Sequence, residues 1–248
     1  MTLGVPPPVN PNQAASLARP AVDLRHLLPT AVPTQGPRPL CLPFAVGGAH
    51  SGARCLASGQ VSCALSAEAL WNGCVSSGCA GSDGTTLAGT GDALASTGQP
   101  PEADWPYNSA LGHGTEAPPP KAGPAPWLRG TLESVSIKHD ERERPLEDVL
   151  SAGQLVVLVV ELTDELAFPN PEGEIAVPPV TAPEGDYHAV LVAGAGTHPN
   201  YPIRRLLIRN SWGPGWGLGG YAWLPIAYLV SFAVQAATIG SASLNWPI

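Results

Sequence analysis

The chain has 248 residues, of which 44% are hydrophobic and 13% charged, with a formal net charge of −8 at pH 7. This composition is typical of a globular protein with an apolar core and excludes a largely disordered chain. The negative charge, without any basic cluster, argues against a nucleic-acid partner. No apolar stretch approaches the roughly 20 residues that a membrane helix needs, so we expect no membrane partner either.

Residues 1–20, "MTLGVPPPVNPNQAASLARP", are rich in proline, asparagine and alanine and predict a flexible N-terminal arm. The arm lacks a basic segment followed by an apolar core, so it does not resemble a secretory signal. We therefore expect a cytoplasmic protein, with a secreted or delivered form left open. Residues 21–248 are expected to form a single domain of two lobes.

The first half of the chain is predicted to be mostly helical. A helix starts at Cys41 in "CLPFAVGGAHSGARCL", and another follows a plausible N-cap at Ser66. A third is expected over 85–98, ending at Gly98. The first helix contains three glycines, each costing up to about 1 kcal/mol relative to alanine, so we expect a central, buried position for it. One face of that helix carries small or apolar residues: Ala45, Ala49, Gly52 and Leu56.

The second half alternates like an antiparallel sheet, which gives an α+β fold. The helical lobe is expected over about 30–120 and the β lobe over about 125–235, with a Pro-rich stretch at 112–127 as their boundary. A short amphipathic helix is predicted at 144–153. The predicted strands are 131–138, 154–162, 186–196, 204–213 and 219–225.

Cys41 has the sequence context of a nucleophile. A cysteine attacks as the thiolate, and unpaired N–H groups at a helix N-terminus lower its pKa. Pro43 in the first turn fits that position, because its missing N–H has no helical partner there. The alternative is a buried thiol that only covers a core helix.

A nucleophilic cysteine needs a histidine base within hydrogen-bond reach. His50 lies nine residues further along the same helix, about 13 Å away, and is excluded. His188 opens the apolar strand "HAVLVAGAG", where a polar ring needs a partner; a satisfied core histidine is the alternative. The other four histidines lie in polar or irregular contexts: His26, His113, His139 and His198.

Asn210 ends the next apolar run, "LLIRN", at a sharp Gly/Pro turn one hairpin from His188. Its side-chain carbonyl can accept the ring N–H and fix the tautomer without adding a charge. Trp212, two residues on, could cover that hydrogen bond and exclude water. Cys41, His188 and Asn210 thus form a complete nucleophile, base and orienting group.

The run "NSWGPGWGLGGYAWL" resembles the Asn-Ser-Trp-Gly signature of papain-like cysteine peptidases. "DYHAV" is similar to the family's catalytic-histidine strand, and "VDLR…TQGPRPLC" to its mature N-terminus and Gln-Gly turn. The resemblance covers roughly residues 20–230 and implies a papain-like two-lobe fold with the active-site cleft between the lobes. By position, it implies that Gln35 and the Cys41 backbone N–H form an oxyanion hole.

The chain departs from the family around the nucleophile. Arg38 stands where the family often has a disulfide cysteine, and Leu42 replaces a tryptophan. Cys79 resembles the half-cystine that would pair with the missing residue, so that bridge cannot form. Two other pairings, Cys74 with Cys79 or Cys55 with Cys63, stand beside the alternative of free thiols. Cys63, Cys74 and Cys79 lack the paired CxxC spacing of a convincing zinc site, so we expect no metal and no cofactor.

Substrate contacts are less defined. The family's cleft-lining Gly-Gly pair is replaced by "GCAGSDGTT", in which Gly81 and Ser82 or else Gly84 could pair with substrate. Val159 and Ala189 could wall an apolar pocket, or could be ordinary core positions. The loop at 168–185 could partly cover the cleft, or could be an ordinary surface loop.

The leading hypothesis is a peptidase that hydrolyses peptide bonds through a thioester on Cys41. The same fold could instead pass the acyl group to an amine, as an amidase or transpeptidase. A third alternative is a peptide-binding module with an unused site; the presence of all four site residues disfavours it. Only about 20 residues precede "AVDLR", so we expect an enzyme that is active as made or restrained by the short arm. The sequence does not specify the substrate or the oligomeric state.

Overall fold

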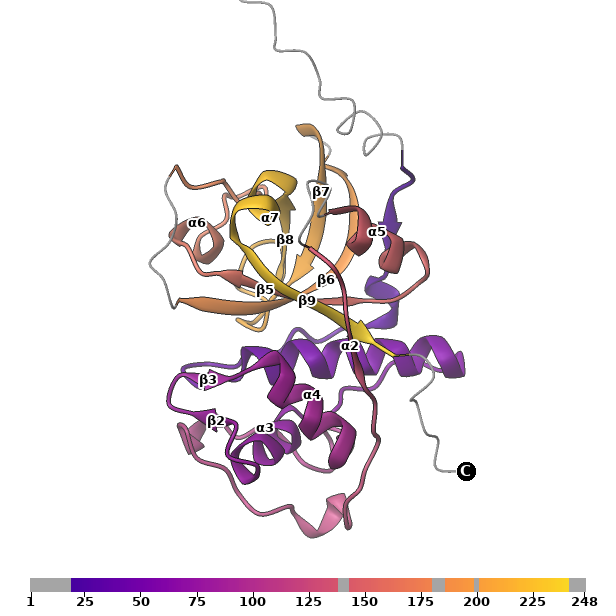
Figure 1. Cartoon of the computed structure of the whole chain (residues 1–248), viewed down its shortest axis with the longest axis vertical. Coiled ribbons are helices and arrows are strands. Elements are labelled where there is room, and N and C mark those ends of the chain that lie inside the picture. Colours follow the sequence, from indigo (N-terminus) through magenta and orange to yellow (C-terminus); the bar gives the residue numbers. More distant parts are fainter. Residues whose placement is uncertain (1–18, 138–142, 180–185, 199–200, 241–248) are drawn as a thin grey trace, which may run out of the picture.

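The computed structural model describes residues 19–137, 143–179, 186–198 and 201–240. Residues 1–18 of the predicted arm lie outside these ranges, as does His139. Two lobes are stacked along the longest axis, and helix α2 (Cys41–Ser58) lies between them (Figure 1). Within the described ranges, no helix is long and apolar enough to cross a bilayer.

The lower lobe in Figure 1 is helical. It holds α3 (Ala67–Ser76), α4 (Leu87–Ser96) and a hairpin of β2 (Ala80–Gly81) with β3 (Gly84–Thr85). The predicted cap is confirmed, because the Ser66 hydroxyl accepts the Ala69 N–H at 3.0 Å. Short 3-10 helices lie at η1 (Arg25–Leu27), η2 (Ser109–Leu111) and η3 (Pro120–Ala122).

The upper lobe is built on an antiparallel sheet of seven strands in the order β4-β9-β5-β6-β7-β8, with β1 also paired to β6. Three helices accompany it: α5 (Glu143–Ser151), α6 (Asp164–Ala167) and α7 (Ile226–Phe232). The strands are β1 (Val22–Asp23), β4 (Leu132–Ser134), β5 (Val156–Glu161), β6 (Tyr187–His198), β7 (Tyr201–Arg209), β8 (Tyr221–Pro225) and β9 (Ala233–Ile239).

The α+β class is confirmed, and each predicted strand overlaps an observed one, although β4 is shorter than the predicted 131–138 and β7 ends at Arg209 rather than 213. Strand β9 was not predicted. No glycine or proline separates α7 from β9, so "IAYLVSFAVQAATI" gives no local signal for the change from helix to strand at Ala233. The strand is specified by its neighbours, since β9 fills the gap between β4 and β5.

Helix α2 is buried against the sheet, as its glycines predicted. A Cβ placed on Gly52 would lie 2.3 Å from Leu155 Cδ1, and one on Gly48 would lie 2.9 Å from Leu191 Cδ2. The glycines therefore let the helix approach β5 and β6 closely. The last turn leaves the core: Leu56 is 48% exposed, so its predicted place on the buried face is wrong.

Candidate active site

Cys41 is the first residue of α2, as predicted. Its own N–H belongs to the first turn, where no helical carbonyl is available to accept it. Gly36 starts the preceding turn at φ 58°, a left-handed conformation that glycine adopts without strain. The sequence "TQGPRPLC" thus forms a turn that delivers the thiol to the helix N-terminus.

The turn before Cys41 is held by a buried ion pair that sequence reasoning missed. Arg38 Nη1 lies 2.5 Å from Glu68 Oε2 and Nη2 lies 3.0 Å from Glu68 Oε1, and both side chains are fully buried. The remaining guanidinium N–H groups donate to backbone oxygens of Gly112, Asn108 and Gly114 at 2.7, 2.8 and 2.9 Å. All five donors are satisfied. An ion pair therefore anchors Arg38, at the position where the resembling family often has a disulfide cysteine.

His188 and Asn210 lie together, as predicted. His188 Nε2 is 2.7 Å from Asn210 Oδ1, and both residues are buried. Because the amide oxygen can only accept, Nε2 carries the ring proton and Nδ1 keeps its lone pair. The centroid of the Trp212 ring lies 4.5 Å from the imidazole centroid, with 35° between the two planes, so the indole packs against the base.

The Cys41 thiol lies beside the strand that carries the histidine, because it interacts with the backbone N–H of Ala189. Burial raises the pKa of Cys41 above its ordinary value, and the N–H groups of Ala189, Leu42 and Cys41 only partly oppose this. Burial also lowers the pKa of His188 to about 4, against the hydrogen bond to Asn210. Burial therefore favours the neutral thiol and the neutral imidazole over their charged forms. Burial thus opposes the decrease in pKa that the helix N-terminus predicts for Cys41.

Gln35 is buried and fixed on both sides of its amide. Its Nε2 donates to the Arg38 carbonyl at 2.9 Å, and its Oε1 accepts the Ser211 hydroxyl at 2.5 Å. The backbone N–H of Gln35 also donates to Ser211 O at 2.7 Å, and its carbonyl accepts the Tyr107 hydroxyl. One N–H of the amide remains for another acceptor. These bonds tie Gln35 to the segment that follows Asn210.

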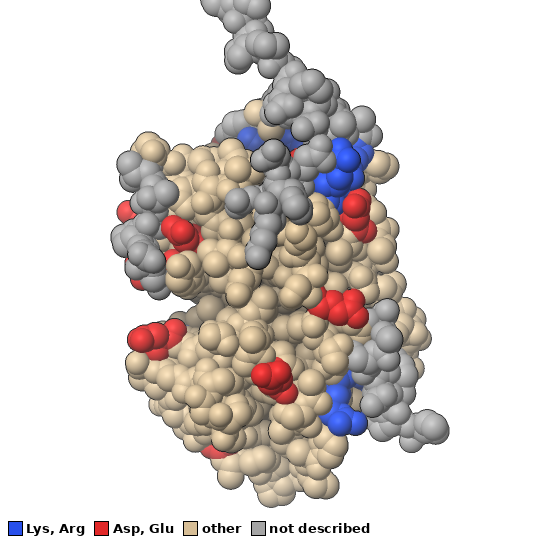
Figure 2. Space-filling view, viewed as in Figure 1, with Lys and Arg blue, Asp and Glu red and all other residues tan. Residues whose placement is uncertain are grey.

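The candidate substrate residues fall in two places. Gly81 and Ser82 are exposed on the β2–β3 hairpin, whereas Gly84 lies against the turn before the nucleophile: a Cβ there would be 3.3 Å from Pro39 O. Val159 and Ala189 are direct cross-strand partners on β5 and β6, both buried. Figure 2 shows the surface hollowed at its left edge, between the α6 side of the upper lobe and the β2–β3 hairpin.

The loop expected at 168–185 is anchored in part. Ile175 is fully buried and its N–H donates to Trp223 O at 3.1 Å. Glu174 forms a buried ion pair with Arg205. Residues 173–175 are therefore anchored on β8, whereas Phe168 is 79% exposed; residues 180–185 lie outside the described ranges.

All five cysteines lie in the described part of the chain and are free thiols, so neither proposed disulfide forms. Burial raises the pKa of Cys74 to about 12. At Cys79 burial also opposes the thiolate, but hydrogen bonds from Ser77, Thr85 and Cys74 outweigh it and lower the pKa. Among the described residues, no group of three or more His, Cys, Asp or Glu side chains could hold a metal ion.

Two lobes on a central helix, with a cysteine at the helix start and a His–Asn pair on the facing sheet, define a papain-like fold. The sequence model described as papain family cysteine protease matches residues 19–232. The chain belongs to this family. No curated protein sequence matches the chain.

Solved structures give the same fold. The proform of the ragweed pollen allergen Amb a 11, a cysteine protease, superposes with a TM-score of 0.71 at 24% identity, covering 91% of this chain and 65% of that one. Xylellain, a cysteine protease from Xylella fastidiosa, gives 0.70 at 24% identity over 91% of this chain and 88% of its own. Digestive procathepsin L 3 of Tenebrio molitor gives 0.70 at 23% identity over 91% and 72%. At these identities the likeness establishes the fold.

Proposed function

We propose that the chain is a cysteine peptidase in which Cys41 is the nucleophile, His188 the base and then acid, and Asn210 the orienting group. The observation that carries the proposal is the buried His188–Asn210 hydrogen bond of 2.7 Å. This bond leaves Nδ1 as the unprotonated ring nitrogen on a residue whose neighbour, Ala189, contacts the thiol. Such a pair needs a substrate carbonyl to attack, and a peptide supplies one.

The reaction begins when the Cys41 S–H proton moves to His188 Nδ1 as sulfur attacks the scissile carbonyl carbon. The oxyanion that forms accepts the Cys41 backbone N–H and the remaining Gln35 Nε2–H. The imidazolium then gives its proton to the leaving amine, and the C–N bond breaks to leave a thioester. Water, deprotonated by His188, attacks the thioester and releases the acid and the thiol.

We infer that an extended peptide is bound in the hollow beside the β2–β3 hairpin. Gly84 suits backbone pairing with a substrate, because it has no side chain and lies next to the nucleophile turn. Val159 and Ala189 suit an apolar wall. The net charge of −8 gives no reason to expect a nucleic-acid partner, and we propose a cytoplasmic location with no membrane partner.

The test is intact-mass labelling at near-neutral pH with a peptide-like epoxide directed at cysteine. We expect one label per chain, absent in Cys41→Ala and at least 100-fold slower in His188→Ala. His26→Ala, which removes an exposed histidine, should label like the wild type. Because Cys79 has a lowered pKa, Cys79→Ser is included and should keep the label. Label spread over the other thiols, or no label, would refute the proposal.

Hydrolysis and transfer to an amine are then separated with a peptide ester substrate. We expect the free acid as product even with 50-fold excess of glycinamide over enzyme-bound substrate. If the amide were the main product, the thioester would stand but hydrolysis would not.

A further inference from the structure

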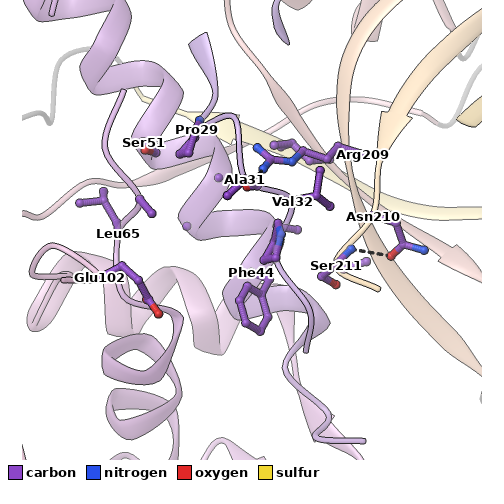
Figure 3. A pocket seen from close by; sticks show the side chains of 17 residues that line it. Pro29, Ala31, Val32, Phe44, Ser51, Leu65, Glu102, Arg209, Asn210 and Ser211 are labelled. Atoms are coloured by element: carbon purple, nitrogen blue, oxygen red, sulfur yellow. Dashed lines mark hydrogen bonds between the residues drawn. The ribbon is translucent and has the colours of Figure 1, made fainter. Parts of the chain in front are cut away.

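A cavity lies between the lobes and adjoins the proposed site, but Cys41 and His188 are not among its lining residues. Its volume is about 230 Å³, and Phe44, Leu65 and Leu191 contribute to its apolar lining. The exposed Ala31 and Ala64 lie at its rim. The proposed site contributes Ala189 and Asn210 to its lining. Figure 3 shows side chains from α2, from the segment before it and from the end of β7 converging on this space.

Arg209 places a buried positive charge on the wall of this cavity. It is 6% exposed, and its Nη2 donates to the Ala31 carbonyl. Its Nε has no hydrogen-bond partner in the part of the chain that the structure describes, and the Tyr221 ring lies 5.9 Å away. No carboxylate of the described residues forms an ion pair with it.

Three other buried arginines of the chain each face a carboxylate. Arg38 faces Glu68, Arg204 faces Glu147 and Arg205 faces Glu174, each at ion-pair distance. A buried charge without a counter-charge is costly, whereas a paired and hydrogen-bonded one is tolerated. Arg209 therefore lacks the carboxylate that those arginines have, and it lacks it beside an apolar cavity.

The next residue, Asn210, also has an unpartnered donor, although Figure 3 shows its amide nitrogen pointing away from the cavity. Asn210 is 2% exposed and its Oδ1 is used by His188 and by the Ser211 N–H. Its Nδ2 has no hydrogen-bond partner among the described residues. Consecutive residues thus supply two unused donors, and no acceptor of the described chain meets either.

We propose that this cavity binds a small apolar monocarboxylate, with its carboxylate on Arg209 and its tail among Phe44, Leu65 and Leu191. A guanidinium binds a planar carboxylate through parallel N–H donors, and the apolar lining takes a hydrocarbon tail. The cavity volume of about 230 Å³ is ample for a ligand of about eight non-hydrogen atoms. Hexanoate has that size.

A carboxyl group lies on the side of the cavity opposite Arg209. Figure 3 shows Glu102 on the other side of the space from Arg209. Its Oε1 already accepts the Tyr107 N–H at 2.7 Å. Burial raises the pKa of Glu102 to about 7, so its carboxyl is not a fixed charge near neutral pH. The guanidinium of Arg209 attracts the anionic head, which therefore takes the Arg209 end. The bound carboxylate would then lie beside Asn210, the residue that holds the imidazole.

The test is titration of the full chain, followed by amide NMR shifts, with three probes: hexanoate, hexanamide and acetate. The Cys41→Ser variant is used, so that no probe is taken up covalently. We expect saturable shifts at Ala45, Gly48 and Leu191 with hexanoate, and at least tenfold weaker binding of hexanamide and acetate. Equal binding of hexanamide would show that the ligand's negative charge, and hence its pairing with Arg209, contributes nothing to binding. Equal binding of acetate would mean that the cavity takes a bare anion only, and either result would overturn the proposal.

Variants localise the site. Arg209→Gln should weaken hexanoate at least tenfold, whereas Arg209→Lys, which keeps the charge, should weaken it less than fivefold. The matched control is Arg25→Gln, since Arg25 also lies 5.9 Å from the Tyr221 ring but pairs with Asp23 and does not line the cavity. Unchanged binding in Arg209→Gln would refute the assignment. Should that variant not fold, the comparison of hexanoate with hexanamide decides alone. Each readout is binding, so none depends on peptidase activity.

Discussion

Removing Glu68 is expected to be among the most destabilising single changes in this chain. Glu68→Ala takes two of the five hydrogen bonds from Arg38 and leaves its guanidinium buried without a counter-charge. Breaking a buried pair in this way costs about 3–5 kcal/mol, a large fraction of the ~5–15 kcal/mol by which a domain is stable. The carbonyl of Arg38 also accepts Gln35 Nε2 at 2.9 Å, so the proposed oxyanion hole should loosen as well.

The assay is urea unfolding of wild type, Glu68→Ala, Arg38→Met and the double variant, followed by tryptophan fluorescence. We expect the double variant to be less destabilised than the sum of the two single variants by at least 2 kcal/mol, because it buries no unpaired charge. The matched control is Asp23→Ala, which breaks an Arg25 pair whose side chains are both 52% exposed and should cost under about 1 kcal/mol. A cost of Glu68→Ala as small as this control, or additive single variants, would refute the reasoning.

Three further predictions concern the dependence of stability on pH, the Trp212 ring that packs against His188, and the packing of α2. Burial holds the pKa values of His50 and His188 at about 4, so below about pH 6.5 the unfolded chain binds more protons than the folded one. The free energy of unfolding should therefore fall between pH 6.5 and pH 4, by roughly 3 kcal/mol for each histidine. A plot of urea midpoint against pH should have about half this slope in His50→Gln, and an unchanged slope would contradict the prediction. Trp212→Ala should let water reach the imidazole and shift the acid limb of kcat/KM upward by at least one pH unit; a lower rate with an unmoved limb would mean that the ring acts only in packing. Gly52→Ala should lower the free energy of unfolding in urea by about 1–3 kcal/mol, because its Cβ would lie 2.3 Å from a buried leucine atom. Gly215→Ala, whose Cβ would have nothing within 4 Å, should leave stability unchanged. Equal effects of the two substitutions would show that α2 can shift to make room.

Much of the fold could be predicted because its signals are local. The Ser66 cap, the helix at Cys41 and the apolar strand before Asn210 each depend on a few neighbouring residues. The switch from α7 to β9 could not be predicted, because no turn residue marks it and only pairing with β4 and β5 specifies it. The exposure of Leu56 was missed for a related reason. Sequence periodicity shows which residues share a face of the helix, but not how far along the helix the sheet covers that face.

For the candidate site, the sequence by itself determined which chemical groups are available and their order: a cysteine at a helix start, a histidine in an apolar strand, and an asparagine at the next turn. Only the tertiary structure decided their state. Burial depends on every element around a group, so the pKa of Cys41 is raised where the local helix end predicted a decrease. The same holds for Glu68 and Arg209, since a charge finds or lacks its partner through contacts between residues far apart in the chain.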